Sequence, residues 1–196
     1  MNSWNIKGHS LEYIDDTHTY LIDGVVVPSI TQILKLRFGN KYDGVSKEVL
    51  NNAREKGTKL HKLIEDYCKE DVLVDDKELR NFIFLKKQYK FDVLDNEVPV
   101  ILFLEDKPVC AGRLDLVLEL DGKIGLADIK RTSVLDKEYL AYQLNLYRVA
   151  YQQCYDKNIE FLRGVHLRED VRKFAMIPIN EEMAVGLLKE YLDNGD

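Results

Sequence analysis

Hydrophobic and polar residues alternate most clearly between Cys110 and Thr132, where the sequence reads CAGRLDLVLELDGKIGLADIKRT. In the middle of this stretch stands the Asp121-Gly122 pair, the strongest short signal for a β-hairpin with a two-residue turn. Such a turn pairs residue 120 with residue 123, and the same register continues outward along both strands. The pattern therefore predicts a long hairpin at the centre of the chain.

The hairpin register gathers charged residues on one face. It sets Asp115 opposite Asp128 and Arg113 opposite Lys130. Because side chains alternate between the two faces of a strand, Asp115, Asp128 and Lys130 share a face. We expect the other face to lie in the core, and it carries Leu114, Leu116, Leu118 and Leu120.

Two aspartates at directly opposed positions of a hairpin repel each other, and their presence requires a physical explanation. Their Cβ atoms would lie about 5 Å apart, and like charges at that spacing destabilise a sheet unless a cation lies between them. Residues 125–127 read Gly-Leu-Ala, which indicates a strand packed on both faces, where a buried carboxylate needs a partner. A metal site is one interpretation. The other is a solvated pair on an exposed face, neutralised by Arg113 and Lys130.

The rest of the chain predicts an α/β protein. Ser29, Ser46 and Asp136 are expected to cap helices, and a break or bend is expected at Gly57. The expected elements are a hairpin at 10–27, helices at 29–36, 46–57, 57–70 and 75–93, a strand at 97–106, the central hairpin, a helix at 136–156, a strand pair at 159–179 and a helix at 180–192. This order fits a single domain, residues 1–196, in which helices flank a mixed sheet. Residues 1–45 would form an N-terminal hairpin and short helix, and residues 46–196 the main core.

Composition narrows the class of protein. The 196 residues are 45% hydrophobic and 32% charged, as in globular domains, and we expect no membrane span or signal peptide. Cys68, Cys110 and Cys154 are scattered, which favours reduced thiols in the cytoplasm and argues against zinc or an iron–sulfur cluster. The net charge of −6 argues against nucleic-acid binding by overall charge alone, but leaves room for a local basic groove.

Two helical stripes carry further candidates. His61 and Glu65 lie on one stripe, and Gly57 four residues before His61 would leave space there for a close approach. Tyr139, Gln143 and Tyr147 recur at intervals of four. On their own, a hydrogen-bonded histidine and an aromatic helix surface are sufficient explanations.

Taken together, the motifs resemble the PD-(D/E)XK nuclease superfamily, and most of all its RecB-like exonuclease branch. The resemblance runs from about residue 18 to about residue 151 and includes the stretch HTYLIDGVVVPSITQIL, typical of small phage-type members. The motifs are Gly57-x-x-x-His61, Glu97, Gly112-x-x-Asp115, Asp128-Ile129-Lys130 and Gln143-x-x-x-Tyr147. This chain departs from the family pattern at Leu114, where proline is usual, and at Arg131-Thr132, where Thr-Gly is common. It also lacks the cysteines that hold an iron–sulfur cluster in some members.

The resemblance implies a restriction-endonuclease-like α/β/α sandwich and a set of roles. Asp115, Asp128, His61 and the Ile129 carbonyl would bind Mg²⁺ or Mn²⁺, with the imidazole favouring Mn²⁺. Asp115, Asp128 and Lys130 would be the catalytic residues, with Lys130 orienting or helping to deprotonate the attacking water. Glu65 and Glu97 would hold a second metal ion or support the ligands, and contacts to DNA would come from Gln143, Tyr147, Arg131 and Arg113.

The expected function is that of a divalent-metal-dependent deoxyribonuclease, more specifically an exonuclease on linear DNA in recombination, repair or phage DNA processing. Its expected partner is DNA and its expected location the cytoplasm, that of the host if the protein is phage-encoded. An endonuclease of the same superfamily, a nuclease fold used for binding or inhibition without catalysis, and an acidic protein with an incidental metal site that assembles with protein partners are the alternatives. Strand preference and protein partners stay open.

Overall fold

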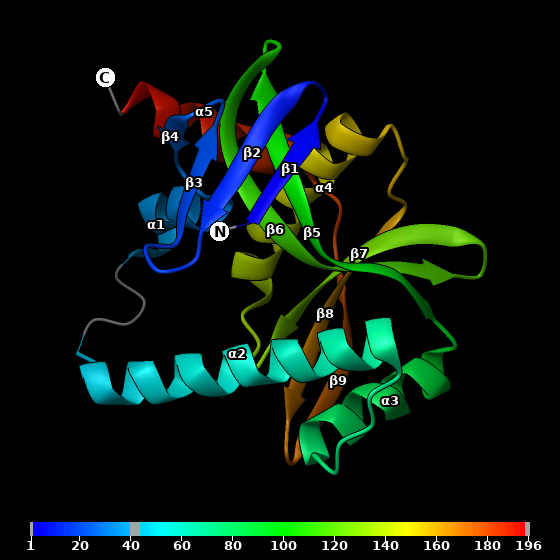
Figure 1. The fold of residues 1–196 in the computed structure, drawn as a ribbon. Helices are drawn as coiled ribbons and strands as arrows, with labels where there is room; N and C mark the ends of the chain where they lie inside the picture. The colour runs from blue at the N-terminus through cyan, green and yellow to red at the C-terminus, as the bar shows by residue number, and fades with distance from the viewer. Residues whose placement is uncertain (1, 40–43, 195–196) are drawn as a thin grey trace.

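The computed structural model describes residues 2–39 and 44–194, in which the chain forms nine strands and five helices (Figure 1). The strands form two sheets. The first is a four-stranded antiparallel sheet near the N-terminus, in the order β1-β2-β3-β4. The second is a five-stranded mixed sheet, in the order β5-β6-β7-β8-β9.

The N-terminal sheet contains the predicted hairpin, which is confirmed as β2 and β3. Its strands are β1 (Asn2–Ile6), β2 (His9–Ile14), β3 (Thr19–Ile22) and β4 (Val25–Val27). The sequence analysis did not predict β1, because NSWNI shows no regular alternation of hydrophobic and polar residues. A backbone hydrogen bond of 3.1 Å from the Ala111 N–H to the Pro28 carbonyl ties the end of this sheet to the central sheet.

The central sheet is mixed, as predicted, because β7 and β8 run parallel while the other neighbours are antiparallel. Its strands are β5 (Asp92–Leu104), β6 (Lys107–Leu120), β7 (Lys123–Lys130), β8 (Phe161–Arg168) and β9 (Val171–Ile177). The turn between β5 and β6 lies at Glu105 and Asp106, which both have positive φ. The strand predicted at 97–106 therefore ended two residues too late, and β5 begins five residues earlier, at Asp92.

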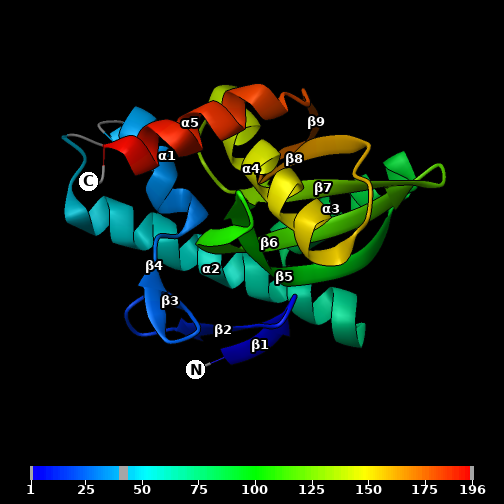
Figure 2. The same cartoon turned by 90° about the horizontal axis from the view of Figure 1, so that it is seen from above.

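Helices cover both faces of the central sheet, which confirms the α/β sandwich. The helices are α1 (Ile30–Phe38), α2 (Lys47–Glu70), α3 (Lys77–Tyr89), α4 (Lys137–Tyr155) and α5 (Glu181–Asp193). Figures 1 and 2 show α2 and α3 on one side, and α1, α4 and α5 on the other. No described helix combines the length and the hydrophobicity needed to cross a membrane.

Each side of the sheet has its own hydrophobic core. Val117 and Leu126 pack toward α1 and α4, whereas Leu116, Leu118 and Ala127 pack toward α2 and α3. Both faces of the central hairpin are thus buried, not the leucine face alone. Leu114 departs from the predicted face and packs in the α4-side core; it lies in the part of β6 beyond the β6–β7 pairing, which ends at Leu116.

The helix starts follow local capping chemistry, which explains why they were predictable. A side-chain oxygen at each start accepts a backbone N–H of the first turn, and the caps are Ser29, Ser46, Asp76, Asp136 and Asn180. The predicted break at Gly57 is wrong, because α2 runs without interruption from Lys47 to Glu70. Glycine in a helix costs only about 1 kcal/mol relative to alanine, which the packing of α2 overcomes.

Substituting Gly57 tests this continuity. We expect Gly57→Ala to raise the free energy of unfolding by about 0.5–1 kcal/mol, because a Cβ there meets nothing within 4 Å and alanine is the better helix former. Gly125→Ala is the contrasting variant, since its Cβ would lie 2.2 Å from the Phe161 ring. Urea unfolding measures both. A loss of stability in Gly57→Ala would indicate a bent or broken helix.

Candidate metal centre

The two aspartates of the central hairpin lie where its strands separate. The predicted register is confirmed from Leu120↔Lys123 to Leu116↔Ala127, where the β6–β7 pairing ends. One residue further, a side chain takes the place of the backbone pairing: Asp115 Oδ2 accepts a hydrogen bond from the Ile129 N–H at 2.7 Å. The expected pairings of Asp115 with Asp128 and of Arg113 with Lys130 are wrong, because the β6–β7 ladder ends at Leu116↔Ala127; beyond that point Arg113 pairs with Pro99 of β5, and Lys130 with His166 of β8.

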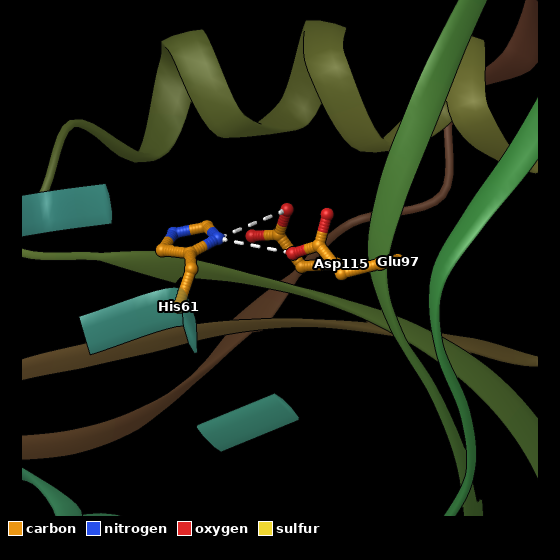
Figure 3. Close-up of side chains that lie close together, drawn as sticks. All are labelled: His61, Glu97 and Asp115. Atoms are coloured by element: carbon orange, nitrogen blue, oxygen red, sulfur yellow. Dashed lines mark hydrogen bonds and ion pairs between the residues drawn. The ribbon is translucent and has the colours of Figure 1, made fainter. Parts of the chain in front are cut away.

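Three side chains from three elements converge beside this point (Figure 3). His61 comes from α2, Glu97 from β5 and Asp115 from β6, and one potential ligand atom of each lies within 4.8 Å of the others. His61 Nδ1 is 3.4 Å from Glu97 Oε1 and 3.7 Å from Asp115 Oδ1. An imidazole and two carboxylates at this spacing form a donor set suited to a divalent cation.

Glu97 reaches the cluster through an unusual backbone conformation. Its neighbours Asn96 and Val98 pair with Leu116 and Leu114, so Glu97 lies across from Asp115. Its φ is 52°, in the left-handed region that a residue with a Cβ rarely occupies in a strand. Non-glycine residues in that region cluster at functional sites. The resemblance assigned Glu97 to a second metal ion or to a supporting role, and the geometry places it among the potential ligands of the cluster itself.

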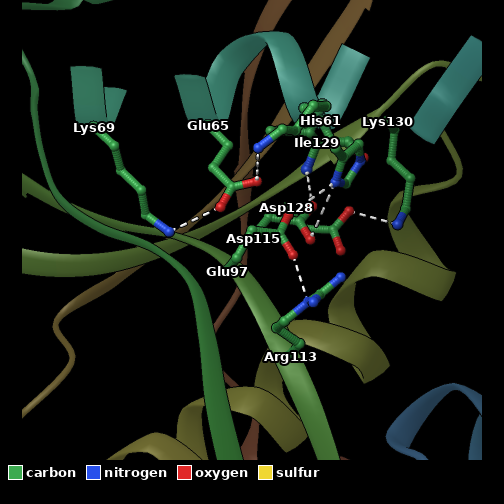
Figure 4. Close-up of polar contacts among 10 residues, drawn as sticks. His61, Glu65, Lys69, Glu97, Arg113, Asp115, Asp128, Ile129 and Lys130 are labelled. Atoms are coloured by element: carbon green, nitrogen blue, oxygen red, sulfur yellow. Dashed lines mark hydrogen bonds and ion pairs between the residues drawn. The ribbon is translucent and has the colours of Figure 1, made fainter. Parts of the chain in front are cut away.

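Asp128, Ile129 and Lys130 complete the surroundings of the cluster (Figure 4). The Ile129 carbonyl lies 3.3 Å from His61 Nε2, so the imidazole bridges the carboxylates and this oxygen. Lys130 Nζ is 2.5 Å from Asp128 Oδ2 and 5.8 Å from the centre of the Tyr139 ring. Asp128 is only 2% exposed, which excludes the alternative of a solvated aspartate pair.

The protonation of the cluster reflects crowded, buried carboxylates. Burial lowers the pKa of His61, but the negative charge of Asp115 and the hydrogen bond to Glu97 outweigh it and raise the pKa to about 9. Burial raises the pKa of Asp115 to about 7, against the attraction of His61. Burial lowers the pKa of Lys130, yet Asp128 and Asp115 together raise it above its ordinary value. A divalent cation would replace the protons of His61 and Asp115 as the charge that compensates the carboxylates.

The cluster lies in a cavity of about 350 Å³. Its walls include most of the residues proposed from sequence, namely His61, Glu97, Arg113, Asp115, Asp128, Lys130, Gln143 and Tyr147. Gln143 Oε1 is buried and has no hydrogen-bond partner in the described part of the chain, which makes it available to a ligand. Gly112 lets Tyr147 approach the floor of the cavity, since a Cβ there would lie 2.8 Å from its ring.

Two other cavities on the surface are of similar size, but the potential metal ligands do not line them. One of about 400 Å³ lies between α2 and the start of α3, beside Lys59 and Glu78. Another of about 480 Å³ lies beside Lys7, His9 and Phe103. Only the 350 Å³ cavity, among these, contains the potential metal ligands, and buried groups with strongly shifted pKa values mark functional sites.

Two residues proposed from sequence make other contacts. Glu65 lies one turn of α2 beyond His61, and its carboxylate pairs with Lys62 and Lys69 (Figure 4). Arg131, expected to contact DNA, turns away from the cavity and binds Glu78 of α3 through two nitrogens, at 2.8 and 2.9 Å. Successive residues of a strand point to opposite faces, so Lys130 and Arg131 cannot both face the cavity.

Arg131→Ala tests this structural assignment. We expect it to lower the free energy of unfolding by on the order of 2–3 kcal/mol, because the Glu78 carboxylate would stay nearly buried without its partner. We expect DNA cleavage by the folded variant to match that of the unchanged protein. Urea unfolding and a cleavage assay measure the two effects. If Arg131→Ala were as stable as the unchanged protein but no longer cleaved DNA, the result would support the DNA contact first assigned to Arg131.

Sequence reasoning missed part of the cavity wall. The missed residues are Tyr13, His18 and Tyr20 of the N-terminal sheet, Ser29 and Thr31 at the start of α1, and Arg54 of α2. Five of these six fall within residues 13–31, well before the catalytic motifs, and no local pattern shows that this segment folds over the site. The sequence analysis placed the stretch from His18 to Leu34 in the predicted hairpin and short helix and in the family resemblance, but gave none of its residues a role at the site.

Comparisons with known proteins give no family for this chain. No family model matches it, and no curated protein shows a significant match. A solved structure described as "Crystal structure of SSO0001" matches 86% of this chain and 75% of its own length, with 16% sequence identity and a TM-score of 0.48. At that TM-score the likeness carries no argument, so a functional assignment depends on the site itself.

Proposed function

We propose that this protein is a divalent-metal-dependent deoxyribonuclease that hydrolyses phosphodiester bonds, acting as an exonuclease on linear DNA. The observation that carries the proposal is the convergence of His61, Glu97 and Asp115 within 4.8 Å, beside the Asp128–Lys130 pair and inside one cavity. The resemblance of these motifs to the RecB-like branch of the PD-(D/E)XK superfamily supplies the choice of reaction and of DNA as substrate.

The residues present fit Mg²⁺ or Mn²⁺. Carboxylate and carbonyl oxygens suit both ions, and the imidazole of His61 favours Mn²⁺. Asp115, Glu97, His61 and the Ile129 carbonyl would hold the ion, and Asp128, whose buried Oδ2 pairs with Lys130, lies next to them. When bound, such an ion lowers the pKa of water and neutralises charge on the phosphate.

The protein residues would orient the reacting groups. Lys130, held by Asp128 and mostly buried in the cavity wall, places a positive charge where a phosphate oxygen or the attacking water would lie. Arg113, paired with Glu97 at 2.6 Å, fixes that carboxylate and adds a second positive charge to the cavity wall. Gln143 and Tyr147 line the same wall, where they would contact the DNA backbone.

We place this activity in the cytoplasm. Cys68, Cys110 and Cys154 are free thiols, as expected in a reducing compartment. The proposal needs no iron–sulfur cluster, because these cysteines are far apart in sequence and form no metal-binding motif.

A cleavage assay on end-labelled DNA tests the proposal. Linear and circular molecules, single- and double-stranded, are incubated with EDTA, Mg²⁺ or Mn²⁺. We expect loss of linear DNA with either metal, no loss in EDTA, and circles left intact. Cleavage of circles would indicate an endonuclease. Absence of cleavage by folded protein with both metals would contradict the proposal and favour a nuclease fold used for binding alone.

A further inference from the structure

His18 stands at the turn between β2 and β3, exposed and on the wall of the cavity that contains the metal cluster. Its backbone has a φ of 52°, in the left-handed region where histidine is enriched among residues with a Cβ. Its N–H closes the turn by donating to the Asp15 carbonyl at 3.3 Å. The turn thus projects the His18 imidazole from the N-terminal sheet toward the site. Neither the motifs nor the proposed chemistry uses this imidazole.

Neighbouring residues fix the position of this imidazole. Its Nδ1 lies 2.6 Å from the Tyr13 hydroxyl. Tyr13 is buried, packs against Tyr20 with ring centres 4.7 Å apart, and lies under the Arg113 guanidinium at 5.4 Å. Arg113 in turn holds Glu97 of the metal cluster. A continuous series of contacts therefore connects the exposed ring at the mouth of the cavity to the potential metal ligands.

A positive charge lies on the same cavity wall. Arg54 belongs to α2, seven residues before His61, so the two side chains point to the same side of the helix about 10 Å apart along its axis. Arg54 is exposed and carries no interaction that would divert it from the cavity among those found for the described residues. When the scissile phosphate of a DNA strand lies at the metal cluster, Arg54 is placed to bind a neighbouring phosphate of the same strand.

The size of the cavity limits what can enter. A volume of about 350 Å³ is at the lower end of the range for pockets that hold one small-molecule ligand. In a duplex the bases are paired and stacked on one another, so a base is free to stack on a protein ring only where the strand is unpaired. Aromatic rings that stack on bases, combined with cationic groups along the backbone, are the usual recognition elements for single strands.

We propose that His18 is a base-stacking residue at the mouth of the cavity and that, together with Arg54, it makes the protein select single-stranded DNA ends. A base of the incoming strand stacks on the imidazole while Arg54 binds the adjacent phosphate. Because every base has a face that can stack, this contact gives strand selectivity without sequence preference. The inference rests on the proposed nuclease function.

His18→Asn tests the role of the ring, because asparagine tolerates the left-handed backbone of the turn but cannot stack as an imidazole does. His9→Asn is the matched control: His9 lies in the same sheet, pairs with Asp23 and is not part of the cavity wall. On a single-stranded linear oligonucleotide with Mn²⁺, we expect His18→Asn to raise KM about tenfold with kcat within about twofold. We expect His9→Asn to leave both unchanged.

Two further measurements complete the test. Tyr13→Phe keeps the buried ring but removes the hydroxyl that holds His18, and we expect KM to rise about threefold. For the unchanged protein we expect kcat/KM on single strands to exceed that on blunt duplex at least about tenfold. Equal KM values for His18→Asn and His9→Asn, or equal use of blunt duplex, would overturn this inference alone. Absence of any metal-dependent cleavage by the unchanged protein would instead overturn the nuclease proposal, and this inference with it.

Discussion

Replacing Lys130 with methionine is expected to reduce metal-dependent DNA cleavage by about 100- to 1000-fold. Lys130 Nζ lies 2.5 Å from Asp128 Oδ2 and on the wall of the cavity, where it would stabilise the charge that develops on the phosphate. Methionine keeps much of the aliphatic packing and removes the charge. The loss should appear in kcat more than in KM, because the interaction strengthens in the transition state.

The control for this variant lies on the same strand. Lys123 is exposed at the other end of β7, so Lys123→Met changes the same residue type without touching the cavity. Because Lys130→Met leaves the buried Asp128 without its cation, its folding must be checked by thermal unfolding. The double variant Lys130→Met with Asp128→Asn removes both charges, so that no unpaired buried charge is left to destabilise the fold. A folded Lys130 variant that cleaves as fast as Lys123→Met would contradict the assigned role.

Asp115→Asn is expected to make the metal-free protein more stable at pH 8, by about 1–3 kcal/mol. The pKa of Asp115 is raised to about 7 by burial, from an ordinary value of 3.8. The folded protein therefore binds the Asp115 proton more tightly than the unfolded chain does. This difference contributes fully to the free energy of unfolding below pH 3.8, and the contribution is lost as the pH rises through 7. Asparagine carries no charge and avoids this loss, although it also removes the attraction to His61.

The pH and metal dependence of unfolding measure this effect. In EDTA, the stability advantage of Asp115→Asn should shrink as pH falls from 8 toward 4. Saturating Mn²⁺ should reverse the order, because binding at 100 times Kd stabilises by about 2.7 kcal/mol and only the unchanged protein retains the full ligand set. If Asp115→Asn were less stable than the unchanged protein in EDTA at pH 8, the Asp115 carboxylate would not be the destabilising buried charge described above.

Features set by local chemistry were predictable from sequence. The helix caps at Ser29, Ser46 and Asp136 follow from one side chain and the next few backbone N–H groups. The register of the central hairpin follows from the Asp121-Gly122 turn alone. These signals need no knowledge of the rest of the fold, which explains why the hairpin and four of the five helix starts agree with expectation.

The features that the sequence did not predict correctly, or did not predict at all, depend on the surroundings of each residue in the fold. Gly57 lies inside a continuous helix because packing outweighs its low propensity. Arg131 points to α3 because the β7 strand alternates its faces, a rule that sequence reasoning applied to Lys130 but not to its neighbour. The left-handed backbone that directs Glu97 to the cluster has no sequence signal at a residue other than glycine or asparagine. The same holds for the approach of His18 and Tyr13 to the cavity, which depends on how the two sheets pack.

The most direct test of the account follows Mn²⁺ binding and DNA cleavage in the same samples. Mn²⁺ is titrated into protein stripped with EDTA, free ion is measured by electron paramagnetic resonance, and cleavage of a labelled linear strand is measured at each point. The account predicts that binding and cleavage rise together in the unchanged protein, that both are lost in Asp115→Asn, and that Lys130→Met binds Mn²⁺ without cleaving. Cleavage in EDTA, or Mn²⁺ binding by Asp115→Asn as tight as that of the unchanged protein, would contradict a catalytic metal held by His61, Glu97 and Asp115.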